Sequence, residues 1–368
     1  MTSPRCPYYT SCGGCVLQHI DYNDQLESKK EKISSIISSD QIKVFHDEPY
    51  GYRTRMDLIF HPEGIGFRKR GNWKKIIDID QCPISNEQLN QLMSEVREEF
   101  TSVDAFDLIR GAGTFKYCVI RTPPEDSSLS FVLNKDSSRI REAVERIQRF
   151  ASKTSANNVA VTYVGGKEDV SVSEDYFVVK GKDMLQEQFF GKRYLYSVQG
   201  FFQNNHNVAE KMVKYVHDLF LGYDTAHAKL LDLYGGVGTF GIMNANMFKS
   251  VTIIESFRAS VELAKKNLAL NKVSNAETIA LDARKIHRVP LERPLYVVTD
   301  PPRSGMHMDT ITHLKYLEPE AIIYISCNAD QLKKDLTKFS GYGVGSAALF
   351  DMFPQTNHSE TVVELVRK

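Results

Sequence analysis

The sequence predicts a doubly wound α/β domain in its carboxyl-terminal half, preceded by an α+β, β-rich domain. After Phe201 the predicted strands alternate with predicted helices, which is the pattern of a parallel sheet covered on both faces. Between about Tyr50 and Tyr196, short β-rich segments follow one another, separated by Gly, Pro, Asp and Ser. Because 368 residues exceed the usual size of a single core, we expect two domains, over 1–195 and 196–368.

The bulk composition is that of an ordinary globular protein. Hydrophobic residues make up 42% of the chain and charged residues 25%, which excludes a disordered or fibrous protein. No apolar run is long enough to cross a bilayer, and the amino terminus lacks the build of a secretory signal. We therefore expect a cytoplasmic monomer with no membrane partner. Lys+Arg and Asp+Glu both number 46, so the net charge neither indicates nor excludes nucleic acid.

The cysteines are unevenly distributed along the chain. Three of the six stand within ten residues near the amino terminus. In a cytoplasmic protein such clustering indicates metal binding or catalysis rather than disulfides. With one downstream cysteine they supply four thiolates, enough for a zinc ion or for an iron-sulfur cluster, and the ligand count does not distinguish the two. The candidate ligands are Cys6, Cys12, Cys15 and Cys82.

The segment after the first cysteines predicts one amphipathic helix over about 21–40, because Leu26, Ile33 and Ile37 recur at helical spacing. In the middle region one helix, over 138–151, interrupts a series of strands. The predicted strands of this region are 52–61, 73–80, 115–122, 129–135, 158–164 and 175–181.

The carboxyl-terminal half predicts two long helices, over 205–221 and 259–271, among its strands. A short polar connection joins the last two strands, so we expect them to form an antiparallel pair at one edge of the sheet. The strands predicted here are 229–235, 250–255, 277–283, 294–300, 321–327, 347–353 and 360–368.

A glycine-rich turn follows the first of these strands, in the stretch LLDLYGGVGTF that begins at Leu230. Its glycines allow a ligand to approach the backbone closely, but their spacing is not the dinucleotide fingerprint, which disfavours nicotinamide. Glu255 ends the next strand, where a carboxylate can accept hydrogen bonds from both ribose hydroxyls, and Asp282 ends the third, near an adenine edge. Either acid alone could be a solvated strand end. The ordered set favours an adenosine-bearing cofactor.

This arrangement resembles the class I (Rossmann-like) S-adenosylmethionine-dependent methyltransferases over residues 229–368. The next strand ends in the sequence TDPPRSG. Adenine and cytosine N-methyltransferases carry a similar Pro-Pro turn followed by an aromatic residue that stacks on the flipped base, whereas this chain has Arg303 there. Methylation of an exocyclic amine is therefore disfavoured.

A hydrophobic strand in the stretch AIIYISCNADQL ends on Cys327. In open α/β sheets the carboxyl end of a strand is where ligands bind, so this position suits a nucleophile as well as a small core residue. DPPRSG, SCNADQLKKDL and DMFPQTNHSE follow in this order, with GFFQNNHNVAEKMV, CPYYTSCGGCVLQH and DQCPIS upstream. Together they resemble the RNA uracil-C5 methyltransferase family, which modifies 23S ribosomal RNA or transfer RNA, and the resemblance covers nearly the whole chain.

The resemblance implies a covalent mechanism. Uracil C5 is too weakly nucleophilic to attack a methyl sulfonium directly, so a thiolate must first add at C6, and the family assigns that step to Cys327. A base must then remove the C5 proton before the thiol can leave. The family's base corresponds to Glu360, with His358 as a less favoured candidate that could instead orient the site.

Binding residues are implied by the same resemblance. The four cysteines would hold a [4Fe-4S] cluster in a lobe of the RNA-binding domain, and the helix over 21–40 would pack on the catalytic domain. Asp300 could instead cap a turn, and Gln203 could be a surface amide. Many members have a cysteine at Gly235, but we expect no loss of activity because the ligand needs backbone approach there. The residues expected to bind S-adenosylmethionine are Gln203, Asp232, Tyr234, Gly235, Glu255, Asp282 and Asp300.

The expected partner is RNA. Since a uracil must leave its stack to reach the thiol, we expect the middle domain to hold folded RNA while one base is extruded. Cations and aromatic residues that fit RNA contact, or a solvated strand pair, are Tyr52, Arg53, Arg55, Phe67, Arg68, Lys69, Arg70, Trp73, Lys74 and Lys75.

The cysteines resemble those of the shorter family members without an amino-terminal TRAM domain, so 23S ribosomal RNA is the preferred substrate and transfer RNA the second. Two rival functions are a redox enzyme that uses the cluster and a non-catalytic RNA-binding protein. The first lacks a flavin or nicotinamide signature, and the presence of both Cys327 and Glu360 disfavours the second.

Overall fold

The computed structural model describes residues 2–62 and 64–368, which divide into two compact units. The first unit contains the residues up to Tyr22, Glu48–Glu187 and Tyr196–His206. The second unit contains Asn23–Asp47, Gln188–Leu195 and Asn207–Lys368. No helix within the described residues is both long and apolar enough to cross a membrane.

The first unit is built on a seven-stranded sheet of order β4-β3-β2-β5-β6-β7-β8. All neighbouring strands are antiparallel except β6 and β7, which are parallel because helix α3 connects them. The elements are β2 (Arg55–His61), β3 (Gly64–Lys69), β4 (Asn72–Asp78), α2 (Glu87–Glu99), β5 (Phe115–Arg121), β6 (Ser128–Asn134), α3 (Ile140–Ala151), β7 (Asn158–Val164) and β8 (Tyr176–Lys180).

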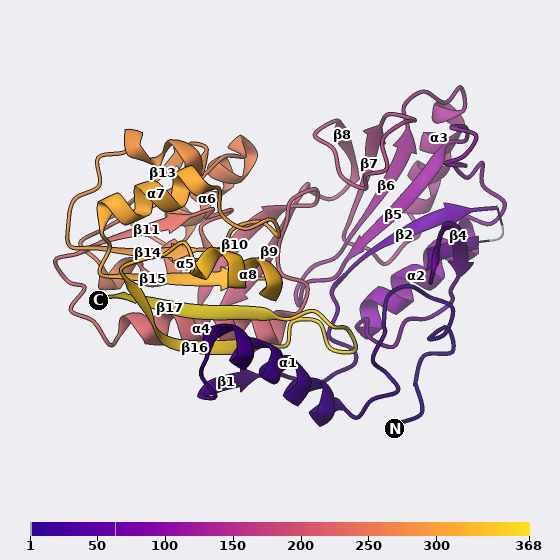
Figure 1. The fold of residues 1–368 in the computed structure, drawn as a ribbon. Coiled ribbons are helices and arrows are strands. Elements are labelled where there is room, and N and C mark those ends of the chain that lie inside the picture. The colour runs from indigo at the N-terminus through magenta and orange to yellow at the C-terminus, as the bar shows by residue number, and fades with distance from the viewer. Residues whose placement is uncertain (1, 63) are drawn as a thin grey trace. The chain divides into compact units, whose positions relative to one another are not determined.

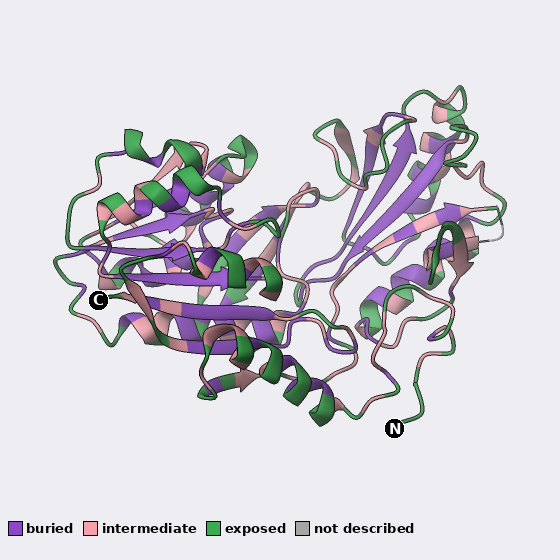
Figure 2. Cartoon of the chain, viewed as in Figure 1, coloured by how far each residue is buried: buried purple, intermediate pink, exposed green. Residues whose placement is uncertain are grey.

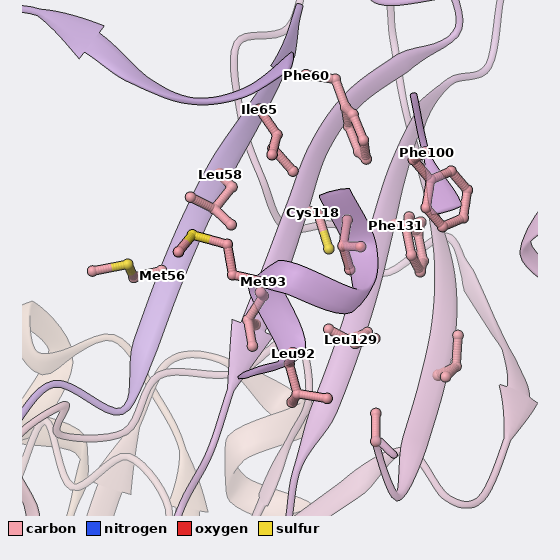
Figure 3. Close-up of a cluster of buried hydrophobic side chains, with 14 of the residues drawn as sticks. Met56, Leu58, Phe60, Ile65, Leu92, Met93, Phe100, Cys118, Leu129 and Phe131 are labelled. Atoms are coloured by element: carbon pink, nitrogen blue, oxygen red, sulfur yellow. The ribbon is translucent and has the colours of Figure 1, made fainter. Parts of the chain in front are cut away.

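Helices α2 and α3 cover one face of this sheet. Figure 3 shows Leu92 and Met93 of α2 gathered with Leu58 and Phe60 of β2 around Cys118. Cys118 is fully buried there and behaves as a small apolar residue. The core of the first unit therefore lies between the sheet and its two helices.

The expectation of a single helix in this region is wrong, because α2 is a second one. Its buried residues Leu89, Leu92, Met93 and Val96 recur at helical spacing. The side chain of Asn86 accepts a hydrogen bond from the backbone N–H of Leu89 at 2.8 Å and so caps the first turn. Both signals are visible in the sequence, but the strand-rich surroundings obscured them.

The second unit is built on an eight-stranded sheet of order β1-β16-β17-β15-β14-β11-β12-β13. The strands from β15 to β13 are parallel, which confirms the doubly wound sheet. The strands are β1 (Ile42–Phe45), β11 (Lys229–Leu233), β12 (Ser250–Glu255), β13 (Ala276–Ala280), β14 (Leu295–Thr299), β15 (Ala321–Ser326), β16 (Tyr342–Phe350) and β17 (Glu360–Arg367).

The last two strands, β16 and β17, form the expected antiparallel pair, but the pair does not lie at the edge. Strand β1, from the amino-terminal part of the chain, adds parallel to β16 and takes the edge position. In Figure 1 the indigo strand β1 lies beside the yellow strand β16. The prediction that the pair lies at the edge is therefore wrong. The sequence did not reveal β1, because this strand is only four residues long and its partner is distant in sequence.

Helices lie on both faces of the second sheet. On one face, Ile311 of α7 and Leu332 of α8 pack against a cluster that includes Tyr324. On the other, the ring of Phe220 in α4 meets that of Tyr296 edge to face at 6.3 Å. Figure 2 shows the strands buried and the outer helix surfaces exposed.

The remaining elements are α1 (Tyr22–Ile37), β9 (Met184–Phe189), β10 (Lys192–Ser197), α4 (His206–Phe220), α5 (Thr239–Asn244), η1 (Ala245–Met247), α6 (Arg258–Leu270), η2 (Ala283–Arg288), α7 (Met308–Leu317) and α8 (Ala329–Leu336). Strands β9 and β10 pair with each other in a separate two-stranded sheet, and η1 and η2 are short 3-10 helices.

Helix α1 is tied to the segment that joins β16 to β17. The ammonium of Lys29 lies 2.6 Å from a carboxylate oxygen of Asp351, and both side chains are buried. The amide of Gln25 both donates to the side chain of Gln355 at 3.1 Å and accepts from its backbone N–H at 3.2 Å. Since breaking a buried ion pair costs several kcal/mol, about 3–5, α1 holds this segment firmly.

Candidate active site

The pairing register of the sheet brings Cys327 and Glu360 together. Ser326, the last residue of β15, is paired with Thr361 of the antiparallel strand β17. Cys327 and Glu360 are the next residue on each strand, so they lie opposite each other. Asp300 follows the neighbouring parallel strand β14 and reaches the same edge of the sheet. Three candidate site residues from separate strands therefore share one end of the sheet.

Cys327 is half-buried in the turn between β15 and α8. The side chain of Asn328 caps α8 by accepting hydrogen bonds from the backbone N–H groups of Asp330 and Gln331, at 3.1 and 3.3 Å. It also donates to the carbonyl oxygen of Arg303 at 3.2 Å. The turn that carries the thiol is thus fixed to the helix and to the DPPRSG turn.

Electrostatics keep the thiol protonated. Burial, followed by the charges of Glu360 and Asp300, raises the pKa of Cys327 to about 11, although the nearby Arg303 opposes this. At neutral pH the group is therefore S–H until it reacts. A thiol in this state needs a neighbouring base to take its proton.

The carboxylates can supply that base. Glu360 is buried, and its Oε2 has no hydrogen-bond partner within residues 2–62 and 64–368. Burial, together with the charge of Asp300, raises the pKa of Glu360 well above its ordinary value, and burial raises that of Asp300. Two acids in one buried site do not both ionise easily, so together they can accept and return a proton near neutral pH.

Asp335 joins the catalytic segments, although the sequence did not single it out. This buried carboxylate accepts hydrogen bonds from the Tyr324 hydroxyl at 2.7 Å, the Gln331 amide at 3.0 Å and the Met306 backbone N–H at 3.1 Å. A Cβ at Gly305 would lie 2.3 Å from its Oδ2, so the DPPRSG turn approaches the helix closely. An acidic residue on the apolar face of α8, three after Leu332, was the available signal.

The glycine-rich turn after β11 is held by backbone and carboxylate contacts. Asp232 is buried and accepts a hydrogen bond from the backbone N–H of Gly241 at 2.8 Å. Burial raises the pKa of Asp232 to about 7, opposed by this hydrogen bond. A Cβ at Gly235 would lie 2.5 Å from Cγ2 of Ile253, so the packing of this chain requires glycine there. Tyr234 has a φ of 61°, a strained value for a non-glycine residue.

The two acids that end the following strands lie at the same edge of the sheet. Glu255 accepts hydrogen bonds from the backbone N–H groups of Gly236 at 3.2 Å and Phe257 at 2.8 Å. Hydrogen bonds from the Arg284 side chain, and then from its backbone N–H, lower the pKa of Asp282 to about 2. Asp282 is therefore a carboxylate at neutral pH, and its oxygens already face a guanidinium.

Two predicted residues are placed differently. Gln203 belongs to the segment Tyr196–His206 of the first unit, so its role stays a prediction. His358 is exposed on the segment between β16 and β17. Its partial burial and the nearby charges of Arg303 and Lys29 lower its pKa. A neutral, exposed imidazole suits an orienting role better than that of the main base.

The four amino-terminal candidate ligands all lie in the first unit. Burial raises the pKa of each thiol, and the thiols act on one another, with Cys15 raised further by Cys6 and Cys12, and Cys82 raised to about 11 in part by Cys15 and Cys6. The backbone N–H of Gly14 donates to the sulfur of Cys12 at 3.4 Å. Four thiols that influence one another in this way are a donor set that fits a metal preferring thiolates.

No metal-ligand arrangement of three or more His, Cys, Asp or Glu side chains occurs among the described residues. The iron-sulfur lobe thus remains a prediction that is supported by the donor set alone. Cations adjoin it, since the guanidinium of Arg70 donates to the carbonyl oxygen of Cys15, and Arg53 lowers the pKa of that cysteine against its burial.

The cations and aromatic residues expected to contact RNA separate into two groups. Some are engaged within the protein, as with Arg55, which bonds Asp57 at 2.7 Å. Tyr52 is buried. Others remain exposed on strands β3 and β4, among them Lys74 and Trp73.

Known proteins resemble this chain in sequence. The chain matches the family model described as tRNA (Uracil-5-)-methyltransferase over residues 21–293 and 291–368. It is 33% identical to the tRNA (uracil(54)-C(5))-methyltransferase of Pyrococcus abyssi, over 99% of this chain and 86% of that protein. It is 31% identical to the protein of the same name from Pyrococcus furiosus, over 99% of this chain and 85% of that protein.

A solved structure gives the same result for the fold. The crystal structure of the Pyrococcus abyssi tRNA (uracil-54, C5)-methyltransferase in complex with S-adenosyl-L-homocysteine matches with a TM-score of 0.79. The sequence identity is 29%, and the match covers 96% of this chain and 86% of that one.

Proposed function

The chain belongs to the RNA uracil-C5 methyltransferase family, and from this premise we propose that it methylates C5 of one uridine in transfer RNA. It is an S-adenosylmethionine-dependent RNA methyltransferase. The preference for 23S ribosomal RNA finds no support in the comparisons, whereas the named relatives act on uracil 54 of transfer RNA. The observation that carries the proposed chemistry is the register that sets Cys327 opposite Glu360.

Cys327 would begin the reaction. As its sulfur bonds to C6 of the flipped uracil, the thiol proton passes to the neighbouring carboxylate site, and the electron pair of the C5–C6 double bond moves into the C4 carbonyl. Asp300 is the better acceptor, because burial raises its pKa to about 7 and the carboxylate of Glu360 then stays free for the later step. The thiolate charge is thereby formed only when the uracil is present to receive it.

When bound, S-adenosylmethionine would supply a methyl group to C5, and its sulfur–methyl bond would break as the new carbon–carbon bond forms. The chain's task at this step is to hold both reactants and exclude water. We propose that the cofactor is held by Gln203, Asp232, Tyr234, Gly235, Glu255, Asp282 and Asp300. The buried Asp232 would act mainly by shaping the turn, through its bond to Gly241.

Glu360 would complete the reaction. Its carboxylate removes the C5 proton, the electron pair re-forms the C5–C6 double bond, and the C6–sulfur bond breaks to release the thiolate of Cys327. The thiolate then takes back the proton held by Asp300, and Glu360 gives the C5 proton to solvent. The unpartnered Oε2 of Glu360 leaves one oxygen available for that proton within the described residues.

We further propose that Cys6, Cys12, Cys15 and Cys82 hold a [4Fe-4S] cluster. When bound, the cluster would supply a cross-link between the amino-terminal segment and the segment before α2, because Cys82 lies far from the other three in sequence. Its place is supported by the mutual influence of the thiols on their pKa values.

The test uses transfer RNA and 23S ribosomal RNA transcripts that contain 5-fluorouridine, incubated with S-adenosylmethionine and the full chain. Fluorine at C5 does not leave as a proton, so the proposal predicts a methylated covalent complex with transfer RNA on denaturing gels. Cys327→Ala should give none, and Cys118→Ala, which alters a core cysteine, should still form it.

Two results would contradict the proposal. No complex with either RNA, in a protein that binds the cofactor, would contradict the covalent chemistry. A complex with ribosomal RNA alone would contradict the proposed substrate and leave the chemistry intact.

A further inference from the structure

A cavity of about 240 Å³ lies in the first unit, whereas Cys327 belongs to the second. It is lined by residues of strands β2 to β5 and by the segment 106–109. Ile59 and Tyr117, which are paired across β2 and β5, line it and belong to a small apolar cluster separate from the core under α2 and α3. The cavity therefore lies at the sheet face that these helices leave uncovered.

Part of the cavity wall is fixed by contacts within the protein. Its Asp169 carboxylate accepts hydrogen bonds from the hydroxyl of Tyr117 and, at 2.6 Å, from the guanidinium of Arg68. The ammonium of the buried Lys116 donates to the Gly165 carbonyl oxygen at 2.9 Å and lies 4.1 Å from the ring centroid of Phe106. Lys116 is thus used within the protein, and its contact helps to fix an aromatic ring in the cavity wall.

The rim of the cavity is cationic and exposed. The ammonium of Lys74 forms no ion pair within the described residues and lies 5.7 Å from the ring centroid of Trp73. Arg68 lies over the same ring, also at 5.7 Å. Trp73, which precedes Lys74 in the chain, is 55% exposed, and Ile109, which lines the cavity, is 75% exposed. Large exposed apolar side chains beside Lys74 indicate a surface that meets an anionic ligand with apolar faces.

An unpaired RNA nucleotide has this chemistry. Its base offers two flat apolar faces for rings such as Phe106, and its phosphate would meet Lys74. The cavity is smaller than the roughly 300–1,000 Å³ of sites for drug-sized molecules, which suits a single base. A free carboxylate oxygen lone pair on Asp169 can accept from an amino or imino group of that base.

We propose that this cavity binds one unpaired base of the RNA substrate, with the adjoining phosphate at Lys74, so that the first unit holds a nucleotide other than the methylated uridine. The proposal rests on the proposed function, since it takes RNA as the substrate. It gives the first unit a role in choosing the RNA that is distinct from the chemistry at Cys327.

The test measures the affinity of the full chain for a transfer RNA transcript by filter binding over a range of salt concentrations. Lys74→Met should raise Kd about three- to tenfold and reduce the salt slope by about one, because one phosphate contact is lost. Phe106→Leu should raise Kd about fivefold or more without changing the slope, because stacking alone is lost. Lys153→Met, an exposed lysine at the end of α3, should stay within about twofold.

A second arm locates the base. Transcripts with single abasic positions outside the methylated uridine are compared on wild-type chain and Phe106→Leu. One position should weaken binding to the wild-type chain but leave binding to Phe106→Leu unchanged, because the variant has already lost that contact. For the same variants, KM for RNA should rise while kcat at saturating RNA stays within about twofold.

The proposal is overturned if Lys74→Met and Phe106→Leu bind transfer RNA like the wild-type chain, or if no abasic position distinguishes wild-type from Phe106→Leu. Lys74 is exposed, so Lys74→Met should fold normally and tests the proposal even if Phe106→Leu has a folding defect. Binding requires no methyl transfer. A wild-type chain that binds transfer RNA through these residues but forms no 5-methyluridine would therefore contradict the proposed function and still support the cavity.

Discussion

Cys327 and the four amino-terminal cysteines are all partly buried thiols with raised pKa values, yet their surroundings differ. Cys327 ends a strand of a parallel sheet, and after burial its pKa is raised by two carboxylates. Cys15 and Cys82 lie outside regular structure, and after burial their pKa values are affected by other thiols.

The difference shows that burial alone does not define a nucleophile. A thiol next to carboxylates has a base that can accept its proton, so its charge can pass into a substrate. Thiols next to one another have no such base, and bringing their charges together requires a cation between them. We therefore expect the neighbouring groups, rather than the size of the pKa shift, to separate a catalytic cysteine from a metal ligand.

The largest expected effect follows from removing the proposed base, Glu360, at the Cys327 site. Glu360→Gln should slow release of 5-methyluridine by about 10²–10⁴-fold, because the C5 proton is no longer removed. A methylated covalent complex should then accumulate with ordinary transfer RNA on denaturing gels. Glu364→Gln, on the same strand but bonded to Tyr223 and Ser346, should keep near wild-type turnover. Turnover of Glu360→Gln within tenfold of wild type would place the base elsewhere.

The next effect concerns the amino-terminal thiols. Cys82→Ala should remove the iron and the visible absorbance of anaerobically purified protein and lower the free energy of unfolding by about 3 kcal/mol, as expected for loss of a tightly bound group. Cys327→Ala should change neither iron content nor melting temperature. Equal iron in Cys82→Ala and wild type would show that this cysteine is not a ligand.

A variant of Asp335 tests whether the site at Cys327 depends on the hydrogen bonds that hold its segments together. Asp335→Asn keeps the size of the side chain but weakens its bonds to Tyr324 and Met306, so kcat should fall about tenfold, or about 1.4 kcal/mol, with KM for RNA little changed. Lys338→Met removes only a partly exposed partner and should have a small effect. A rise in KM alone would contradict a role in positioning the reacting groups.

The smallest effect is on the acidity of the thiol. The charge of Glu360 raises the pKa of Cys327, so Glu360→Gln should lower it and shift the alkylation profile toward lower pH. Because burial is the larger cause and remains, iodoacetamide should react only about threefold faster at pH 8, measured on the Cys327 peptide by mass spectrometry. The fully buried Cys118 provides an unreactive reference. A shift toward higher pH would contradict the assigned cause.

Much of the second unit could be predicted because its signals are local. The strand that ends on Cys327 and the acids Glu255 and Asp282 are each read from a few neighbouring residues. The pairing of Ser326 with Thr361 could not be read in this way, because it joins residues far apart in sequence and is fixed by packing across the sheet. A chemical role could therefore be inferred for each residue alone, but not that Cys327 and Glu360 lie opposite each other.

Features that join distant segments were missed for the same reason. Strand β1 has four residues and finds its partner only in β16. Asp335 stands in an ordinary helix pattern, and only the fold shows that it meets the DPPRSG turn. The cavity wall combines Phe106 with Asp169 from a separate loop. In contrast, α2 has a capping residue and regular hydrophobic spacing, so the sequence does carry the signal for this helix.

The bond between Lys29 and Asp351 has a consequence for synthesis of the chain, since its partners are 322 residues apart. A ribosome releases α1 and β1 long before β16 and the segment that precedes Glu360. The apolar side of α1, which includes Ile33, must wait without its final neighbour Leu349 until β16 has been synthesised. The final packing of α1 therefore depends on a segment that is made much later.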